Sequence, residues 1–417
     1  MKHNGAKIGK LRRWSFLKTV FFLGFTAFGG PQMHIPYFVR KIVDEKNHCD
    51  KQTLLDLNAF CSILPGPSTT QTITALGFKL GGPRLAFLSL LAWLLPGAIL
   101  MTIITISPRF LGTSHLRFLP AMVAAFLCYA VFSMLKLVRP GVLNYLIFAL
   151  AGALGYFITS PFLFPIGIIL GGFLSANFGN RKFVPNNTPF GPVKLANLTL
   201  YMLIFVTIGS AGLVLSRAEK HSEIGKPLIL FENTYRMGSL AFGGGNILAA
   251  MAVEQYANPN ENSPRHRMSL DELNTGLGLI QGMPGPNFNV AVYLNGIAMK
   301  NYKYNTYGQL LGCIIGMIAI FLPGTLLIFF ALPLWDRLQT YPVIQRSLDG
   351  IFATSVGFVL SAALILNVYF WKGNADFTQH IPEISIFGIT LLALASKRIP
   401  SPIIVIGTIL AGAFIPL

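Results

Sequence analysis

Residues 63–72 read "ILPGPSTTQT", and this stretch interrupts an apolar segment with two prolines around one glycine. Proline removes a backbone donor and glycine loosens a helix, so the stretch predicts a helix break. A similar stretch, "GMPGPNFNVA", stands at residues 282–291. The chain therefore breaks a helix twice in the same way, and small polar side chains follow both breaks.

The composition is that of a membrane protein. The chain has 417 residues, of which 53% are hydrophobic and 11% are charged, and its mean hydropathy is +0.60. Apolar runs long enough to span a bilayer occur at 85–106, 119–137, 195–215, 307–332 and 343–366. The sequence therefore predicts an all-α polytopic membrane protein.

The charges and the reactive side chains exclude several other classes. The net charge is +17, but Lys and Arg are spread over many short loops, which indicates membrane topology rather than a nucleic-acid partner. The four cysteines have no metal-type spacing, and neither a catalytic nor an ATP-binding motif occurs. We expect no metal, no cofactor and no enzymatic activity.

The chain contains an internal repeat. "FTAFGGP" at 25–31 matches "SLAFGGG" at 239–245, the two PGP stretches match, and "LLPG" at 94–97 matches "FLPG" at 321–324. Three matches in the same order indicate a duplication. The predicted organisation is a first repeat at 1–178, a linker with a connecting span at 179–217, and a second repeat at 218–417.

Each PGP segment has a helix start before it, at Asp50 and at Ser269, where Glu272 completes a capping box. The segment can either cross the bilayer as a broken helix or return as a re-entrant hairpin. With a cytoplasmic N-terminus, crossing puts 19 Lys and Arg inside and 12 outside, whereas PGP hairpins give 15 and 16. We therefore predict about 13 spans in two inverted homologous repeats, each with a PGP-broken helix.

The breaks suggest an anion site. A helix that restarts after a break has unpaired amides and a positive dipole end, both of which favour an anion. Hydroxyl and amide side chains stand at both restarts, and glycine clusters would let a ligand approach the backbone. The alternative is that both breaks only allow close helix packing. The predicted substrate-binding residues are Gly29, Gly30, His34, Gly66, Pro67, Ser68, Thr69, Gln71, Arg236, Gly243, Gly244, Asn246, Gly285, Pro286, Asn287 and Asn289.

Two charged residues stand inside the apolar segment before the second glycine cluster. Arg236 is a candidate to hold the anion, and Glu232 is a candidate to accept a coupling proton. Their i, i+4 spacing also fits a structural pair that neutralises itself. His34 lies near the site if its loop folds back, and a purely structural role is the alternative.

Several of these stretches resemble the signatures of the chromate ion transporter family. They are "FGGPQMHIPYFVRKIVDE", "LPGPSTTQ", "AFGGGN" and "GMPGPNFN", and the resemblance extends over nearly the whole chain, as in the long members with two homologous halves. One departure is "PYF" after His34, where a glycine before the tyrosine is more usual. The family motif residues carry over to Gly29, Gly30, Pro31, His34, Arg40, Pro65, Gly66, Pro67, Ser68, Gln71, Gly243, Gly244, Asn246, Pro284, Gly285, Pro286 and Asn287.

The resemblance implies a multi-pass plasma-membrane protein that moves chromate, usually outward for resistance. It also implies halves of opposite orientation, with sulfate exchange or protons as coupling partners; a homodimer is left open. The physics fits a tetrahedral divalent oxyanion, and sulfate has the same shape and charge. The rival interpretations are a permease for sulfate or another anion, an anion channel, and a membrane scaffold without transport.

Overall fold

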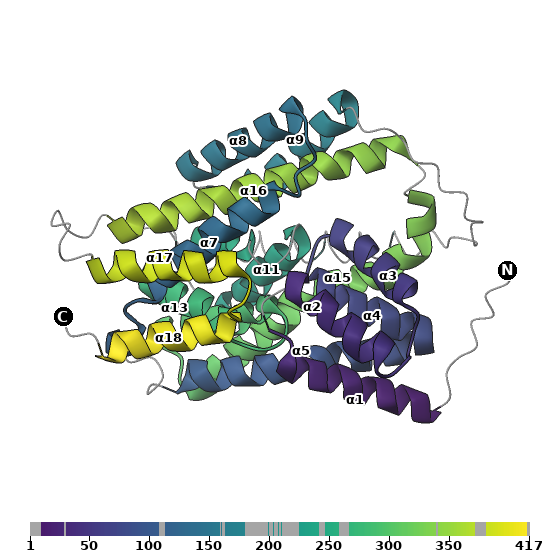
Figure 1. Cartoon of the computed structure of the whole chain (residues 1–417), viewed down its shortest axis with the longest axis horizontal. Coiled ribbons are helices and arrows are strands. Elements are labelled where there is room, and N and C mark those ends of the chain that lie inside the picture. The colour runs from purple at the N-terminus through teal and green to yellow at the C-terminus, as the bar shows by residue number, and fades with distance from the viewer. Residues whose placement is uncertain are drawn as a thin grey trace.

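The computed structural model describes residues 10–28, 31–107, 113–158, 160, 163–179, 225–241, 247–257, 267–338, 341–371 and 381–414, with a few single positions between 199 and 210. These residues form helices and connecting turns. Gly29, Gly30, Gly243, Gly244 and Asn246 lie outside the described residues, and so does most of the predicted span at 195–215. Figure 1 shows the helices packed as one bundle.

The first repeat contains α1 (Lys10–Thr26), α2 (Pro31–Phe38) with the π-helical η1 (Val39–Asp44), α3 (Lys51–Ile63), α4 (Ser68–Gly81), α5 (Pro83–Ile106), the short α6 (Thr113–Leu116), α7 (Leu119–Leu135), α8 (Val142–Phe157) and α9 (Leu163–Phe178). The second contains α11 (Gly225–Leu240), α12 (Ile247–Tyr256), α13 (Leu270–Gln281), the 3-10 turn η4 (Asn287–Asn289), α14 (Val290–Asn301), α15 (Thr306–Leu338), α16 (Pro342–Trp371), α17 (Ile381–Ser396) and α18 (Ser401–Phe414).

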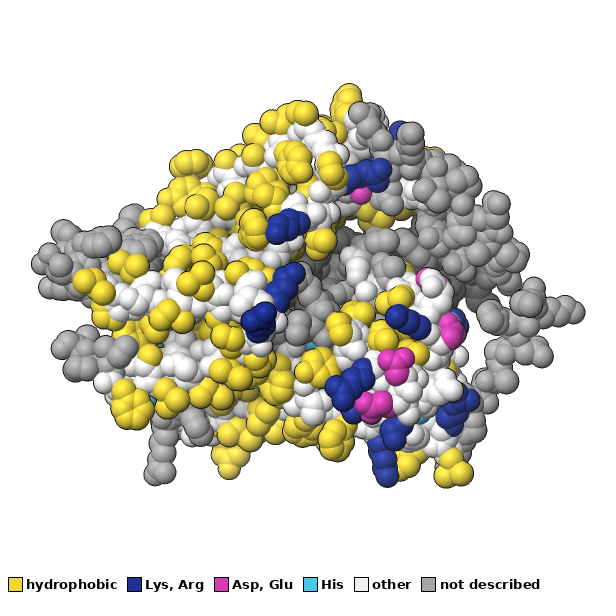
Figure 2. All heavy atoms as spheres, in the orientation of Figure 1, with side chains coloured by type: hydrophobic (Ala, Val, Ile, Leu, Met, Phe, Trp, Pro, Cys, Tyr) yellow, Lys and Arg dark blue, Asp and Glu magenta, His cyan; other side chains and the backbone are white. Residues whose placement is uncertain are grey.

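The apolar helices match a membrane environment. Among the described helices, Pro83–Ile106, Thr306–Phe330 and Pro342–Val368 are long and apolar enough to cross a bilayer. Five shorter apolar helices, α7, α8, α9, α17 and α18, accompany them. Figure 2 shows hydrophobic side chains over these helices on the left and top of the molecule, whereas charged side chains gather on the right near α1 to α4.

The helix boundaries at the breaks follow the sequence. The Asp50 side chain accepts a hydrogen bond from the Thr53 amide and caps α3, and Ser269 and Glu272 form the predicted capping box before α13. Helices α3 and α4 have 13 and 14 residues and are separated by the first PGP stretch. Gly66 and Gly285 have φ of 113° and 84°, which L-residues with a side chain rarely adopt.

Each PGP segment folds back on itself. Asn301, the last residue of α14, donates from Nδ2 to the Glu272 carboxylate in the first turn of α13 (2.9 Å). In the first repeat the Thr72 hydroxyl lies 3.4 Å from the Asn58 side-chain oxygen, so α3 and α4 also run side by side. The prediction that the PGP segments cross the bilayer is therefore wrong, because the two helices of each segment pack against each other instead of continuing in one direction.

The segment before each PGP segment is also a hairpin. Arg12, near the start of α1, donates to the Asn47 carbonyl just after η1 (2.6 Å). In the second repeat, Thr234 of α11 meets the Tyr256 hydroxyl at the end of α12 (2.7 Å). Each repeat thus begins with two helical hairpins, one formed by the helices before and after the FGG stretch and one with its tip at the PGP stretch.

Candidate functional site

The hairpins of the two repeats contact each other through two equivalent backbone hydrogen bonds, one in each direction. The Gly66 amide donates to the Ala241 carbonyl (2.8 Å), and the Gly285 amide donates to the Ala27 carbonyl (2.9 Å). Each alanine belongs to the AFGG stretch of the opposite repeat. A contact exchanged in this way is the mark of a two-fold relation between the repeats. The two PGP breaks therefore lie together at the interface of the repeats.

The LPG stretches pack against the same tips, again in both directions. A Cβ atom added to Gly97 would lie 2.6 Å from Asn289 Nδ2 and still closer to the Pro284 carbonyl oxygen. A Cβ atom added to Gly324 would lie 3.1 Å from Gln71 Nε2 and 3.2 Å from Pro67 Cδ. Glycine at both positions lets the long helices α5 and α15 pass close to the opposite PGP tip.

Two neutral side chains, those of Gln71 and Asn289, form hydrogen bonds where α5 and α15 pack against the PGP tips. Gln71 donates from Nε2 to the Pro65 carbonyl (2.7 Å) and lies 3.4 Å from the Gly324 carbonyl oxygen. Asn289 donates to the Leu94 carbonyl in α5 (3.2 Å). Both side chains are almost fully buried, so these bonds satisfy backbone groups at the interface that water does not reach.

The start of α4 is a buried run of hydroxyl and amide residues. Ser68, Thr69, Thr70 and Gln71 are all buried, with exposed fractions of 8% or less. The N-cap residue is Pro67, which gives no side-chain cap. The first backbone bond of the helix is donated by the Gln71 amide to the Pro67 carbonyl. The amides of the three residues before Gln71 therefore stand at the positive end of the α4 dipole.

His34 lies against this helix start, on helix α2 and not in the loop that the sequence analysis assumed. Its Nδ1 is 3.4 Å from the Thr69 hydroxyl, and its ring packs edge-on against Trp93 with centroids 5.2 Å apart. Trp93 in turn donates from Nε1 to the Thr70 hydroxyl (3.1 Å). The imidazole is fully buried. His34 and Trp93 together fix the first turn of α4, and the sequence analysis had not singled out Trp93.

The second restart is built differently. It begins with the 3-10 turn η4, in which the Asn289 amide already bonds the Pro286 carbonyl (2.9 Å). Phe288 occupies the position that corresponds to Thr69, and it is buried against Phe321 with ring centroids 6.3 Å apart. Asn287 lies on a small pocket between α7, α12 and α13 whose lining is mostly apolar. The two restarts therefore differ both in their first backbone hydrogen bond and in their side chains.

Arg236 and Glu232 form the i, i+4 pair that the sequence left as one interpretation. Their closest atoms are 3.5 Å apart, and Arg236 Nη2 also donates to the side-chain oxygens of Asn233 (2.7 Å) and Gln255 (3.0 Å). The Arg236 side chain is 22% exposed and that of Glu232 is 9% exposed. The pair is therefore held between α11 and α12, near the end of α11 that leads to Ala241.

A second polar network lies deeper in this hairpin. Asn295 of α14 donates to the Thr234 hydroxyl (2.9 Å), which also meets the Tyr256 hydroxyl, and all three residues are fully buried. The residues at the corresponding places of the first repeat are Val20, Ile42 and Leu76, and these are fully buried as well. The second repeat therefore has a polar network within its hairpins at places where the first repeat is apolar.

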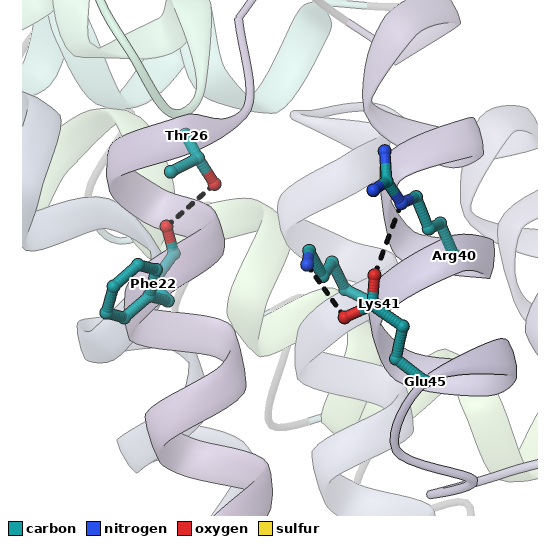
Figure 3. Close-up of polar contacts among 5 residues, drawn as sticks. All are labelled: Phe22, Thr26, Arg40, Lys41 and Glu45. Atoms are coloured by element: carbon teal, nitrogen blue, oxygen red, sulfur yellow. Dashed lines mark hydrogen bonds and ion pairs between the residues drawn. The ribbon is translucent and has the colours of Figure 1, made fainter.

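The basic residues after His34 lie at the open end of the first hairpin. Figure 3 shows Glu45 between Arg40 (3.2 Å) and Lys41 (2.7 Å), beside α1, where the Thr26 hydroxyl donates to the Phe22 carbonyl. The hydrogen bond from Lys41 lowers the pKa of the Glu45 carboxyl. These exposed pairs contribute little stability, because solvent screens them.

Comparison with known proteins gives a consistent result. The sequence pattern of the family described as chromate transporter matches residues 14–176 and 228–414. The uncharacterized transporter MJ0718 of Methanocaldococcus jannaschii is 26% identical over 366 residues, which cover 84% of this chain and 82% of the relative. The chromate transport protein of Pseudomonas aeruginosa is 25% identical over 356 residues, which cover 81% and 76%. No solved structure matches. With the family pattern present in both repeats, the chain belongs to the chromate transporter family and is a membrane transporter of that family.

Proposed function

We propose that the protein is a secondary transporter that carries chromate across the plasma membrane, outward, and so confers chromate resistance. The anion binds where the hairpin tips meet, at the helix start that follows a PGP break. The observation that carries the proposal is the pair of reciprocal bonds, Gly66 to Ala241 and Gly285 to Ala27. They support one site at the interface of two related halves, which is a recurring plan of secondary transporters.

The chemistry of the tips suits a tetrahedral oxyanion. Such an anion accepts hydrogen bonds on four oxygens, and the start of α4 presents amides and hydroxyls at the positive end of a helix dipole. Arg236 remains a candidate to contribute charge, although its guanidinium is already bonded to Glu232, Asn233 and Gln255. Glu232 is the candidate to accept a coupling proton.

We further propose that the two halves lie inverted in the membrane. Four hairpins dip in and return, and the crossing segments are α5, α7, α8, α9, the apolar run at 195–215, α15, α16, α17 and α18. Five crossings, counting α5 itself, then separate the start of α5 from the start of α15, and an odd number inverts the second half. Its hairpins enter from the opposite side, which allows tips to meet at one depth.

The distribution of positive charge supports this topology. With the N-terminus cytoplasmic, the outer side carries Arg109, Arg117, Arg217, Lys220, Lys226, Arg265, Arg267, Lys300, Lys303 and Lys372. Arg236 lies within a hairpin, so of the 32 Lys and Arg residues 21 lie inside and 10 outside. This bias is stronger than the one that crossing PGP segments would give, and it follows the positive-inside rule.

The test is radiolabelled chromate flux in everted membrane vesicles energised by respiration. We expect accumulation in vesicles with the protein, its loss with a protonophore, and competition by excess sulfate, because sulfate shares the shape and charge of chromate. No accumulation by folded protein would refute the function. Sulfate flux that chromate does not affect would favour a sulfate permease instead, and flux beyond carrier rates without coupling would favour a channel.

The topology has its own test. Single cysteines that replace Lys51 and Lys303, in a chain without its native cysteines, are exposed to a membrane-impermeant thiol reagent in intact cells. We expect labelling at position 303 but not at position 51. Labelling of both positions from the same side would refute the inversion, while leaving chromate transport untouched.

A further inference from the structure

We propose that α2 and η1 together form a hinged arm that moves during transport, and that the equivalent hairpin of α11 and α12 in the second repeat stays rigid. This inference rests on the proposed function and deepens it, because it names the part of the chain that opens the way to the hairpin tips. It assigns opposite mechanical roles to two hairpins that correspond in the sequence.

The first argument is the irregular backbone of the arm. Pro36 lies inside α2, where it removes the hydrogen bond to the carbonyl four residues earlier. The π-helical η1 follows, and the Glu45 amide bonds the Arg40 carbonyl five residues back (2.9 Å). The equivalent α12 is a regular α-helix, with Ala250 at the place of Pro36. Prolines and π-helical turns are the places where helices bend, so the arm has a hinge that α12 lacks.

The second argument is how each hairpin is bonded along its length. In the second repeat the Tyr256 hydroxyl of α12 meets the Thr234 hydroxyl of α11 (2.7 Å). The equivalent residues of the first repeat, Ile42 and Val20, are apolar, and among the described residues no side-chain hydrogen bond joins η1 to α1. A buried hydrogen bond fixes the geometry of two helices, whereas apolar side chains can slide past each other.

The third argument is the open end of each hairpin, where His48 and Arg267 occupy equivalent places. The His48 amide bonds the Ile42 carbonyl (2.9 Å). The Arg267 amide bonds the Tyr256 carbonyl (2.8 Å), and both side chains are buried. The backbone therefore closes both hairpins in the same way, and only the side chains can make one end firmer than the other.

These two side chains make very different contacts. Arg267 donates to the Gln255 carbonyl and to the Tyr302 hydroxyl (2.8 Å), which ties the end of α12 to the end of α14. The His48 ring packs edge-on against Phe16, with centroids 5.4 Å apart, and neither ring nitrogen has a hydrogen-bond partner in the described part of the chain. The second hairpin is thus locked at its open end, and the first is held there by apolar packing.

The arm can therefore bend at Pro36 and carry η1 away from α1 and α3, against which it packs. In the proposed topology the open end of this hairpin is cytoplasmic. The movement opens a path from the cytoplasm to the tips, where the anion binds, while the second repeat keeps its shape.

The first experiment is hydrogen–deuterium exchange with mass spectrometry on the purified full-length protein in detergent. After correction for intrinsic rates, we expect the amides of η1 to exchange about tenfold faster or more than those of the last turns of α12, as for one or two missing hydrogen bonds. Tyr256→Phe should raise the exchange rate of α12. Tyr293→Phe is the matched control, because this buried tyrosine of α14 makes no hydrogen bond through its hydroxyl within the described residues.

The second experiment compares chromate flux with equilibrium chromate binding in Pro36→Ala, which restores the missing helix hydrogen bond. We expect slower exchange in the arm and a flux reduced by about tenfold, with binding changed by less than about twofold, because a hinge governs the rate of opening. Pro120→Ala is the control, since Pro120 is the second residue of α7, where no helix bond is lost, and its flux should stay at the wild-type level.

Equal exchange rates in η1 and α12 of the wild-type protein would overturn the inference, and this comparison needs neither chromate nor a variant. Wild-type flux in Pro36→Ala despite slower exchange in the arm would overturn it as well. Wild-type protein that neither binds nor moves chromate would instead remove the proposed function and leave the difference in exchange standing.

Discussion

The close approach of Gly97 to the second PGP tip can be tested by Gly97→Ala. The new Cβ atom would lie 2.6 Å from Asn289 Nδ2 and closer still to the Pro284 carbonyl, against 3.4 Å or more for ordinary contacts. The tip must therefore retreat from α5 by about 1 Å, and forced overpacking of this kind costs about 1–3 kcal/mol. A displacement of about 1 Å at a binding site is enough to reduce activity by up to about a hundredfold.

The assay compares this variant with Gly407→Ala in α18, where an added Cβ atom meets nothing within 4 Å. Alanine favours a helix over glycine by about 0.5–1 kcal/mol at both sites, so the comparison isolates the packing effect. We expect Gly97→Ala to melt at a lower temperature in detergent than Gly407→Ala and to lose most of its chromate flux. Equal melting temperatures and equal flux would refute the packing argument.

Three further predictions concern the tips, a cap and the ion pair. Gly66→Ala and Gly285→Ala should each lose about 1–2 kcal/mol of stability in thermal melts, because alanine is strained at their positive φ. Asp50→Ala should lose about 1 kcal/mol of capping energy at neutral pH. Backbone hydrogen bonding lowers the pKa of Asp50, so the cap acts above the ordinary aspartate pKa and is lost as pH falls through the lowered value; melts across acid pH should show a smaller pH effect in the variant. Glu232→Gln and Arg236→Gln should each melt below the double variant, because either one alone removes the counter-charge bonded to a largely buried ion and keeps that ion.

Local features of the fold were predictable from the sequence. The caps at Asp50 and Ser269 and the breaks after Ile63 and Gln281 lie where the residues predicted them, since capping and proline chemistry act within a few residues. The duplication could be recognised in the sequence because its motifs occur in the same order in both repeats.

The direction of the chain after each break was not predictable locally. A PGP stretch stops a helix, but whether the next helix continues or returns depends on partners far away, such as Glu272 for Asn301. The charge count misled the sequence analysis because it folded back only the PGP segments and left the first segment, now the hairpin of α1 and α2, as a span. The acceptors Ala27 and Ala241 were missed because an alanine carbonyl has no sequence signal, although both AFGG stretches share that residue.

The reciprocal bonds between the tips have a consequence for biosynthesis. The Gly66 amide finds its acceptor at Ala241, in the half of the chain that is made later, and the Ala27 carbonyl receives its donor only with Gly285. Unpaired backbone groups are not stable in the lipid interior. The first half is therefore inserted in the membrane before these two hydrogen bonds can form, and its fold is completed only after the second half has been synthesised. Halves expressed from separate genes should accordingly need each other to mature, and each alone should be a substrate for membrane proteases.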